Sequence, residues 1–376
     1  CVFGITDYFQ MDILGFKVNM MDTQKSIYTS TFGNINTYTI YVAALLAISM
    51  ILFTQEKNQK RMFWYYGNMI LTSFALIMGC SDNAYLSLAA IFGLAPLWLF
   101  QTKTGLRRYV ISLATFFTVI LCINGINKAY AASVLGIDSA FNLIAGTKLL
   151  PVLVVLLWVI AVVLIFMNRK PQALMNRTTD DSMNKIAVYI WIGVIAVVCL
   201  AVLFVLYDAN LGGHADKYGA LSSYVVFNDE WGTQRGYVWK RAMEIYTKKL
   251  NLLQKIFGYG PDTFALIMQY YYPGEMQNGR MVIFDSAHNE YLHYLVTTGF
   301  VGMASYLVFM VSSIVAMAKK IKEQPIVAAV MLAVTAYAIQ AVVNINLPIA
   351  MPIILQLLAM GVGRKKTADK AEEKAE

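Results

Sequence analysis

The chain has 376 residues, of which 58% are hydrophobic and 14% are charged. A water-soluble domain carries about a quarter charged residues, so this composition excludes a soluble globule, a disordered chain and a coiled coil. The net charge of +8 would suit a nucleic-acid partner, but the basic residues lie beside apolar segments, where they set membrane orientation, and we expect no nucleic acid to bind.

The first 37 residues precede the first long apolar segment and are predicted to lie on the outer side of a membrane. They begin at Cys1 rather than Met and lack the basic and apolar regions of a signal peptide, so we expect an N-terminally truncated chain. The four cysteines are scattered, and their spacing predicts neither a disulfide framework nor a metal site.

Nine apolar segments follow, most of them close to the length that crosses a bilayer as a helix. None carries a charged residue or a histidine except at an edge. We predict transmembrane helices at 38–54, 63–80, 84–101, 109–126, 150–167, 186–207, 299–318, 325–343 and 348–363. The predicted fold class is therefore all-α: a polytopic bundle of about nine transmembrane helices with one long helical outer loop.

The distribution of basic residues predicts the orientation of this bundle. The larger share of the 30 Lys and Arg residues lies in alternate connections and in the tail after Arg364, and positively charged connections face the cytoplasm. We expect a multi-pass protein of the cytoplasmic (inner) membrane. Its predicted parts are an outer segment at 1–37, six helices at 38–207, a large extracytoplasmic loop at 208–298, three helices at 299–363 and a cytoplasmic tail at 364–376.

The outer loop 208–298 is the longest polar segment and holds all three histidines. A loop of this length usually has a function. An amphipathic helix is predicted from Gln234, and Arg235 and Trp239 fall on one face of it because they are four residues apart. Its apolar face is predicted to comprise Val238, Ala242, Ile245 and Tyr246.

Two further helices are predicted in this loop. Pro261 opens one that ends near Tyr270, and Ser286 is a plausible N-cap of the other. The helix after Ser286 would present His288, Tyr291, Leu292 and Leu295 on one face. Taken singly these features have ordinary explanations: an interfacial arginine usually contacts lipid or solvent, a lone histidine is usually structural, and Tyr270–Tyr272 suggest an interfacial belt rather than a sugar platform.

Several motifs occur together in this chain. The outer loop and the helix after it contain Arg235-Gly-x-x-Trp239-x-x-Ala242, Gly258-x-Gly260 with Phe264, Ala287-His288-Asn289-x-Tyr291-Leu292 and Gly299-x-x-Gly302. Outside the loop are Thr31-Phe-Gly-Asn-Ile-Asn36 and Ser81-Asp-Asn-Ala84-Tyr-Leu. From about residue 30 to 363 the chain resembles the O-antigen ligase and O-antigen polymerase family of membrane glycosyltransferases. The family has Pro in place of Ile35 and often has Arg where this chain has Asp82.

The resemblance implies an enzyme of surface polysaccharide assembly. Such enzymes transfer a glycan from an undecaprenyl diphosphate donor to a glycan or lipid acceptor on the outer side of the membrane, and a ligase forms lipopolysaccharide. Arg235 is the expected catalytic contact to the leaving diphosphate, because a guanidinium offers two parallel donors. His288 is the expected catalytic contact to the acceptor hydroxyl. The expected substrate-binding residues are Trp239, Arg280, Asn289, Tyr291 and Asp285.

Some parts of this interpretation have alternatives. Asp285 is also a candidate carboxylate partner for His288. The arginine that is absent at Asp82 could be replaced by Lys240, Arg241, Arg280 or a residue of the missing N-terminal segment. No cofactor and no metal are expected, because the outer segments have no carboxylate cluster with ligand spacing. Two other functions stay open: a repeat-unit polymerase for O-antigen or capsule, and a polysaccharide flippase or transporter, which the lack of ionisable residues inside the spans disfavours.

Overall fold

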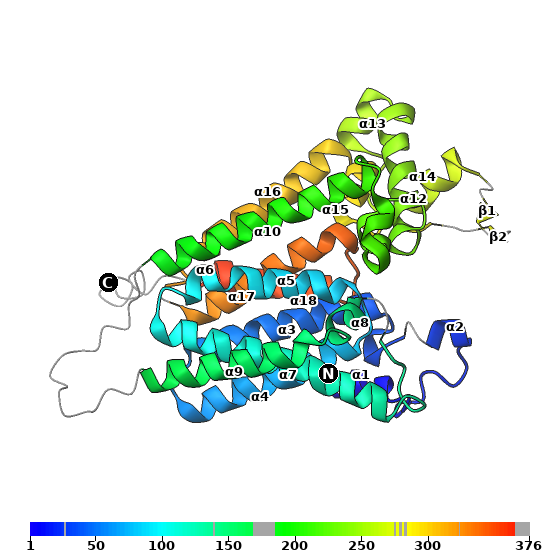
Figure 1. Cartoon of the computed structure of the whole chain (residues 1–376). Coiled ribbons are helices and arrows are strands. Elements are labelled where there is room, and N and C mark those ends of the chain that lie inside the picture. Colours follow the sequence, from blue (N-terminus) through cyan, green and yellow to red (C-terminus); the bar gives the residue numbers. More distant parts are fainter. Residues whose placement is uncertain are drawn as a thin grey trace, which may run out of the picture. The chain divides into compact units, whose positions relative to one another are not determined.

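The computed structural model describes residues 1–25, 28–137, 140–167, 185–273, 276–277, 280–281, 284–322 and 324–364 (Figure 1). Within these ranges the chain is helical apart from turns and one antiparallel pair of two-residue strands, β1 (Met276–Gln277) and β2 (Arg280–Met281). The predicted all-α fold class is confirmed. The chain divides into unit 1, with residues 1–194, 314–340 and 347–376, and unit 2, with residues 195–313 and 341–346.

Each of the nine predicted apolar segments contains a helix. They are α3 (Ile35–Gln55), α4 (Gln59–Met78), α5 (Asn83–Leu94) with α6 (Pro96–Leu99), α7 (Lys103–Ala129), α9 (Leu149–Met167), α10 (Ile186–Asn210), α16 (Gly299–Ala318), α17 (Pro325–Gln340) with η5 (Ala341–Val343), and α18 (Met351–Gly363). Six are long and apolar enough to cross a membrane: α3, α7, α9, α10, α16 and α17 with η5. The α5–α6 pair and α18 are shorter, and α4 begins with the polar residues Gln59, Lys60 and Arg61.

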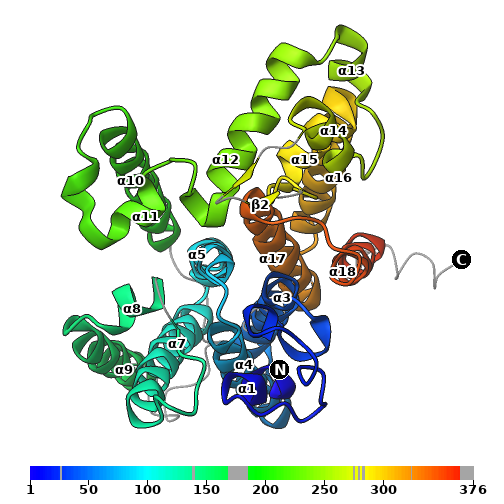
Figure 2. The same cartoon turned by 90° about the vertical axis from the view of Figure 1, so that its right-hand side faces the viewer.

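The core of unit 1 is built around α3 and α17. Helix α3 packs against α4, α5, α7 and α17, while α7 packs against α9 (Figure 2). In the most apolar stretches of α3 and α17, 78% and 61% of the residues are buried. Helices that are apolar on all sides must be surrounded by other helices or by lipid, and these two are surrounded mainly by helices.

The apolar side chains of other helices are exposed. In the most apolar stretch of α10 no residue is buried, and in that of α16 only 17% are buried. Exposed apolar surface of this extent is stable only against lipid, because water would be in contact with a continuous hydrocarbon face. The chain is therefore a multi-pass membrane protein.

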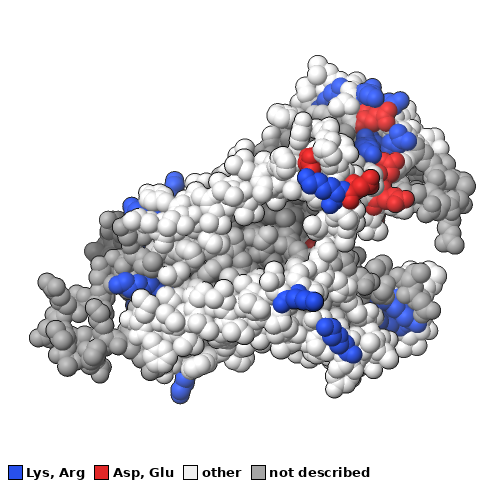
Figure 3. All heavy atoms as spheres, viewed as in Figure 1, with Lys and Arg blue, Asp and Glu red and all other residues white. Residues whose placement is uncertain are grey.

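Unit 2 contains the predicted outer loop. After α10 the chain forms η3 (Ala215–Leu221), α11 (Ser222–Val225), α12 (Trp231–Glu244), the π-helical turn η4 (Ile245–Lys249), α13 (Leu252–Phe257), α14 (Phe264–Tyr271), the β1–β2 pair and α15 (Glu290–Thr297). The predicted apolar face of α12 is confirmed, since Val238, Ala242 and Ile245 are at most 2% exposed in one hydrophobic cluster and Tyr246 packs against it. In Figure 3 most of the charged side chains in view gather where α12 and α13 lie, and the surface along the long helices is mostly uncharged, with scattered Lys and Arg.

Two predicted helix starts are wrong by three residues. Helix α14 begins at Phe264 rather than Pro261, because Asp262 has a φ of 58° and interrupts right-handed helical geometry. Helix α15 begins at Glu290, and its N-cap is Asn289 rather than Ser286, because His288 has a φ of 45°. His288 therefore precedes the helix and is not part of its predicted face.

The orientation of the spans can be tested by thiol labelling. Single cysteines replacing the exposed residues Lys57, Lys103 or Lys319 in a cysteine-free parent should be shielded from an impermeant thiol reagent in intact cells. A cysteine at the exposed Asn228 should be labelled. All four should react after permeabilisation, and labelling of Lys319 without labelling of Asn228 would invert the orientation.

Candidate active site

Arg235 follows a turn in the left-handed backbone conformation. Gly232, Thr233 and Gln234 have φ values of 62°, 61° and 73°, and regular helix begins with Arg235. Left-handed geometry costs roughly 1–2 kcal/mol for each residue that is not glycine, so the surrounding structure must hold this turn. One constraint is at Gly236, where any Cβ would overlap the backbone carbonyl of Asn228. Strain held in this way is typical of functional sites.

His288 also has a left-handed backbone and is fixed from both sides. The indole N–H of Trp239 in α12 donates to the carbonyl oxygen of Ala287 at 2.8 Å. On the other side, the Asn289 side chain accepts from the backbone N–H of Leu292 at 2.9 Å and so caps α15. Trp239 is therefore a positioning residue, which holds the segment carrying His288 against the helix that Arg235 begins.

Arg235 and His288 act on each other electrostatically. Burial lowers the pKa of His288 below its ordinary value, and the positive charge of Arg235 lowers that pKa further. The charge of Asp285 has the opposite, smaller effect. The imidazole is consequently neutral at neutral pH. Its Nδ1 is buried and has no hydrogen-bond partner among the described residues, and a neutral imidazole can accept a proton.

A groove of about 470 Å³ opens between α12, α15 and the start of α16. Its lining is almost wholly apolar. Three predicted substrate-binding residues, Trp239, Asn289 and Tyr291, line this groove together. The other lining residues are Phe227, Lys240, Met243, Leu292, Leu295 and Met303.

The sequence of this region matches a known family. Residues 131–307 match the family model described as O-antigen ligase. We refer to these residues as the O-antigen ligase domain, after the family model that they match. A comparison with curated proteins finds no significant match. The matched range includes the whole loop 208–298, and hence Arg235, His288 and the groove; the motifs at 31–36 and 81–86 lie outside it.

The two glycine motifs of the O-antigen ligase domain meet where two backbones cross. Gly258 and Gly299 have φ values of 71° and 69°. The carbonyl oxygen of Thr297 accepts hydrogen bonds from the backbone N–H groups of Tyr259 and Gly260, both at 2.8 Å. A Cβ on Gly258 would overlap Thr297, and a Cβ on Gly299 would overlap the backbone around Ile256. These glycines thus join the end of α13 to the junction of α15 and α16.

Replacing Gly299 by Ala should destabilise the O-antigen ligase domain. The left-handed backbone costs roughly 1–2 kcal/mol for a residue with a Cβ, and the overlap with the backbone around Ile256 adds to that cost. The measurement is the thermal unfolding midpoint of the purified protein. Gly67→Ala is the matched control, because Gly67 lies within α4 with open space around it. Equal midpoints for the two variants would contradict the structural role of Gly299.

Two other basic residues of the loop, Arg241 and Lys240, have local partners. The Arg241 guanidinium pairs with Glu244 at 3.1 Å and lies over the rings of Tyr237 and Tyr272, at 5.3 Å and 4.7 Å from their centroids. The Lys240 ammonium pairs with a carboxylate oxygen of Asp229 at 2.7 Å. Because each is already paired with an acid, Arg241 and Lys240 are weak candidates for a second phosphate contact.

The described residues that line the groove do not include the other two predicted substrate-binding residues, Arg280 and Asp285. The side chain of Arg280 lies outside the described part of the structure, so its predicted substrate contact stays a prediction. Asp285 is exposed, and although its charge raises the pKa of His288, no hydrogen bond or ion pair joins these two described residues. Its effect on His288 is therefore through space.

Sequence reasoning missed His293. Its ring stacks on Phe264 with centroids 5.3 Å apart, and its Nδ1 is buried without a hydrogen-bond partner among the described residues. Burial lowers its pKa, against the opposing charges of Asp262 and Asp285. The only signal was its place among three histidines of the loop, since the helix expected from Ser286 put His288 and His293 on different faces.

The third histidine, His214, lies where α10 ends. Its Nδ1 is 2.7 Å from a carboxylate oxygen of Asp208. The same carboxylate accepts hydrogen bonds from Tyr218 at 2.6 Å and from Lys217 at 3.2 Å. These contacts fold the chain back over the end of α10, which accounts for His214 structurally.

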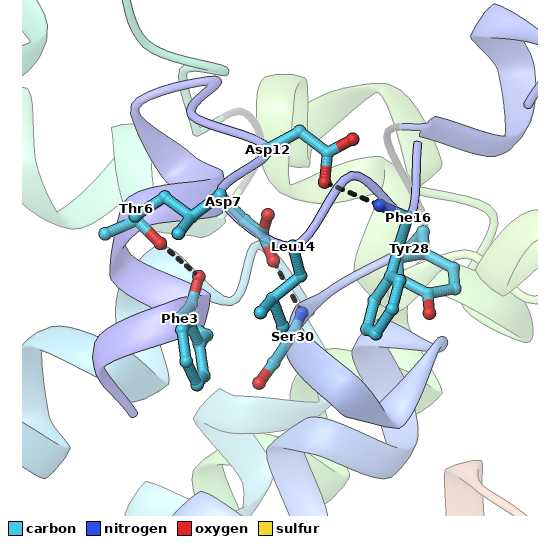
Figure 4. A pocket seen from close by; sticks show the side chains of 9 residues that line it. Phe3, Thr6, Asp7, Asp12, Leu14, Phe16, Tyr28 and Ser30 are labelled. Atoms are coloured by element: carbon cyan, nitrogen blue, oxygen red, sulfur yellow. Dashed lines mark hydrogen bonds between the residues drawn. The ribbon is translucent and has the colours of Figure 1, made fainter. Parts of the chain in front are cut away.

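The two motifs outside the matched range meet within unit 1. The Asn36 side-chain oxygen accepts from Ser81 Oγ at 2.8 Å and from Asn83 Nδ2 at 3.0 Å. Upstream, the Asp7 carboxylate accepts from the backbone N–H of Ser30 at 2.6 Å and so fixes the turn before this motif (Figure 4). The pocket beside Asp7, between α1 (Val2–Tyr8) and η1 (Ser30–Phe32), holds about 10 Å³, enough for roughly one water molecule and too little for a glycan.

Proposed function

We propose that the O-antigen ligase domain transfers a glycan from undecaprenyl diphosphate to an acceptor on the outer face of the cytoplasmic membrane. The family match supports a role in surface polysaccharide assembly. The observation that carries the finer proposal is that His288 is half-buried in that domain and close enough to Arg235 for the guanidinium charge to add to the effect of burial in lowering the pKa of the imidazole. A guanidinium suits the leaving diphosphate, and a neutral imidazole suits the acceptor hydroxyl, which must lose a proton.

The proposed reaction is a displacement at the anomeric carbon of the donor sugar. The oxygen of an acceptor hydroxyl forms the new glycosidic bond as the bond to the diphosphate oxygen breaks, so the configuration inverts. The hydroxyl proton passes to the neutral imidazole of His288. The electron pair of the broken bond stays on the diphosphate, and the Arg235 guanidinium stabilises that negative charge with two parallel hydrogen bonds.

The groove supports a lipid-linked donor. Its apolar lining suits the first isoprene units of the lipid, while Asn289 and Tyr291 supply polar groups near His288. In this proposal Arg235 binds the diphosphate and the apolar groove binds the lipid chain, so together they suit the two halves of a polyprenyl diphosphate. Among the described residues no group of three His, Cys, Asp or Glu side chains is placed to hold a metal ion, and the metal independence of the reaction stays a prediction.

A defined transfer assay tests this function. The purified full chain in nanodiscs should transfer glycan from a synthetic polyprenyl diphosphate donor to lipid A core, releasing one polyprenyl diphosphate for each inverted linkage. The matched monophosphate donor should react far more slowly, because it offers Arg235 less charge. Extension of a second lipid-linked unit in place of lipid A core would identify a repeat-unit polymerase. Absence of transfer to either acceptor would contradict the proposal.

The pH dependence of transfer should report the His288–Arg235 pair. Because neutral His288 accepts the proton, kcat/KM should fall as the pH drops through a pKa below the ordinary histidine value of about 6.5. Arg235→Gln removes a positive charge and should raise the pKa of His288. The fall of kcat/KM on the acid side of the profile, its acid limb, should therefore move to higher pH in this variant. Asp285→Asn removes a negative charge and should move the limb to lower pH. Unchanged profiles in both variants would show that His288 is not the titrating group.

A further inference from the structure

Helix α13 in unit 2 presents large apolar side chains outward. Leu252, Leu253 and Phe257 are 72%, 69% and 63% exposed. The helix is nevertheless well formed, because Asn251 and Gln254 make a reciprocal capping box at its start. An exposed apolar patch on an ordered helix indicates a surface that is covered in the working protein.

The position of α13 is set by the crossing of Gly258 and Gly299. This crossing places the end of α13 against the first residue of α16, and Figures 1 and 2 show α13 at the edge of unit 2 beside that end of α16. Helix α16 has 20 residues, which span about the 30 Å of a bilayer core. A bilayer crossed by α16 would have the first residue of this helix where the acyl chains meet the head groups, and the end of α13 would lie at the same depth.

The residues flanking these apolar side chains are basic. Lys248 and Lys249 are exposed in the turn before α13, and Lys255 lies within the helix. The Lys248 ammonium is 3.8 Å from a carboxylate oxygen of Glu244, but its side chain stays 72% exposed and can reach a lipid phosphate as well. The Lys255 ammonium is held by the carbonyl oxygen of Thr247 at 2.8 Å, which keeps it beside the other two. Exposed leucine and phenylalanine with several lysines on one short segment are typical of helices that lie on anionic membranes.

We propose that α13 and these three lysines form an interfacial anchor that seats the outer loop on anionic phospholipids. Leu252, Leu253 and Phe257 enter the acyl boundary, and the ammonium groups contact lipid phosphates. Lipid, rather than a protein, is the occupant because the patch continues into the first turn of α16, where Phe300 and Val301 are 56% and 44% exposed on a candidate span. The anchor is independent of the proposed glycan transfer.

Spin-label accessibility tests the depth of this anchor. Nitroxides would be placed singly at Leu252, Leu253 and Phe257 in the cysteine-free full chain, in vesicles of phosphatidylethanolamine and phosphatidylglycerol. The ratio of oxygen to nickel-chelate accessibility should approach that of a label at Val308, which is 67% exposed on α16. It should clearly exceed that of a label at Asp216, an exposed acidic residue of η3. Ratios equal to that at Asp216 would overturn the proposal.

A second arm tests the lysines. With the label at Phe257, exchanging phosphatidylglycerol for phosphatidylcholine should lower the accessibility ratio. The triple variant Lys248→Gln, Lys249→Gln and Lys255→Gln should have a low ratio in both lipids. The matched control Lys217→Gln, an exposed lysine of η3, should behave as the parent. An equal Phe257 ratio in both lipids would overturn the role of the anionic head groups, and thermal unfolding midpoints would show that each variant is folded.

Discussion

Replacing Arg235 by Lys should lower glycan transfer by about a hundredfold or more while the amount of inserted protein stays unchanged. Lysine keeps the charge but replaces a planar pair of parallel donors by a single ammonium, so it cannot reproduce a bidentate contact to the leaving diphosphate. Arg235→Ala should be at least as impaired. The loss should fall mainly on kcat, because the negative charge of the leaving group develops in the transition state.

Arg241→Lys is the matched control for this change. Arg241 lies on the same helix, and it is already paired with Glu244 and stacked on two tyrosines. Lysine at that position can keep the ion pair, so transfer should be affected little. The quantity to measure is the initial rate of transfer per mole of inserted protein, with donor concentration varied. Near-normal transfer by Arg235→Lys would show that Arg235 makes no bidentate contact to the leaving diphosphate, and most of the proposed mechanism would then be wrong.

Features that depend on periodicity were predictable from sequence. The nine apolar segments all contain helices, because a run of about 20 apolar residues has few other stable forms in a membrane. The buried face of α12 was also predictable, since Val238, Ala242 and Ile245 recur at the spacing of a helix that packs on one side. Both are local signals that do not require knowledge of distant contacts.

Features that depend on contacts between distant segments were not predictable. Ser286 has the chemistry of an N-cap, but the hydrogen bond from Trp239 to Ala287 and the left-handed backbone of His288 delay the helix to Glu290. The crossing of Gly258 and Gly299 joins segments that are 41 residues apart in the chain. Helix α13 has only six residues, too few for its apolar face to show a period.

The candidate site was predictable in composition but not in arrangement. The resemblance indicated Arg235 and His288, and the structure adds that burial and then the guanidinium charge lower the pKa of the imidazole. Trp239 was expected to bind substrate; it lines the groove and also fixes the His288 segment through its indole N–H. That second role depends on a tertiary hydrogen bond, which residue types and spacing do not encode.

His288→Ala should lower the rate of transfer by roughly a hundredfold or more, with binding of the polyprenyl diphosphate donor nearly unchanged. The imidazole is proposed to act on the acceptor hydroxyl, so its removal takes away the proton acceptor while leaving the diphosphate contact of Arg235 in place. His288 lies in a turn outside the membrane-spanning helices, so insertion should be normal. The readouts are single-turnover transfer, donor affinity and the amount of inserted protein.

His214→Ala serves as the matched control, because that histidine is exposed and bonded to Asp208 at the end of α10. It should retain most of its transfer activity. The variant that lacks both Arg235 and His288 should be far less impaired than the product of the single losses, because two groups that serve one transition state are not independent. Multiplicative losses would indicate that the two residues act on separate steps. A fall in transfer that only follows a fall in inserted protein would assign His288 to folding, leaving the acceptor hydroxyl without its proposed base.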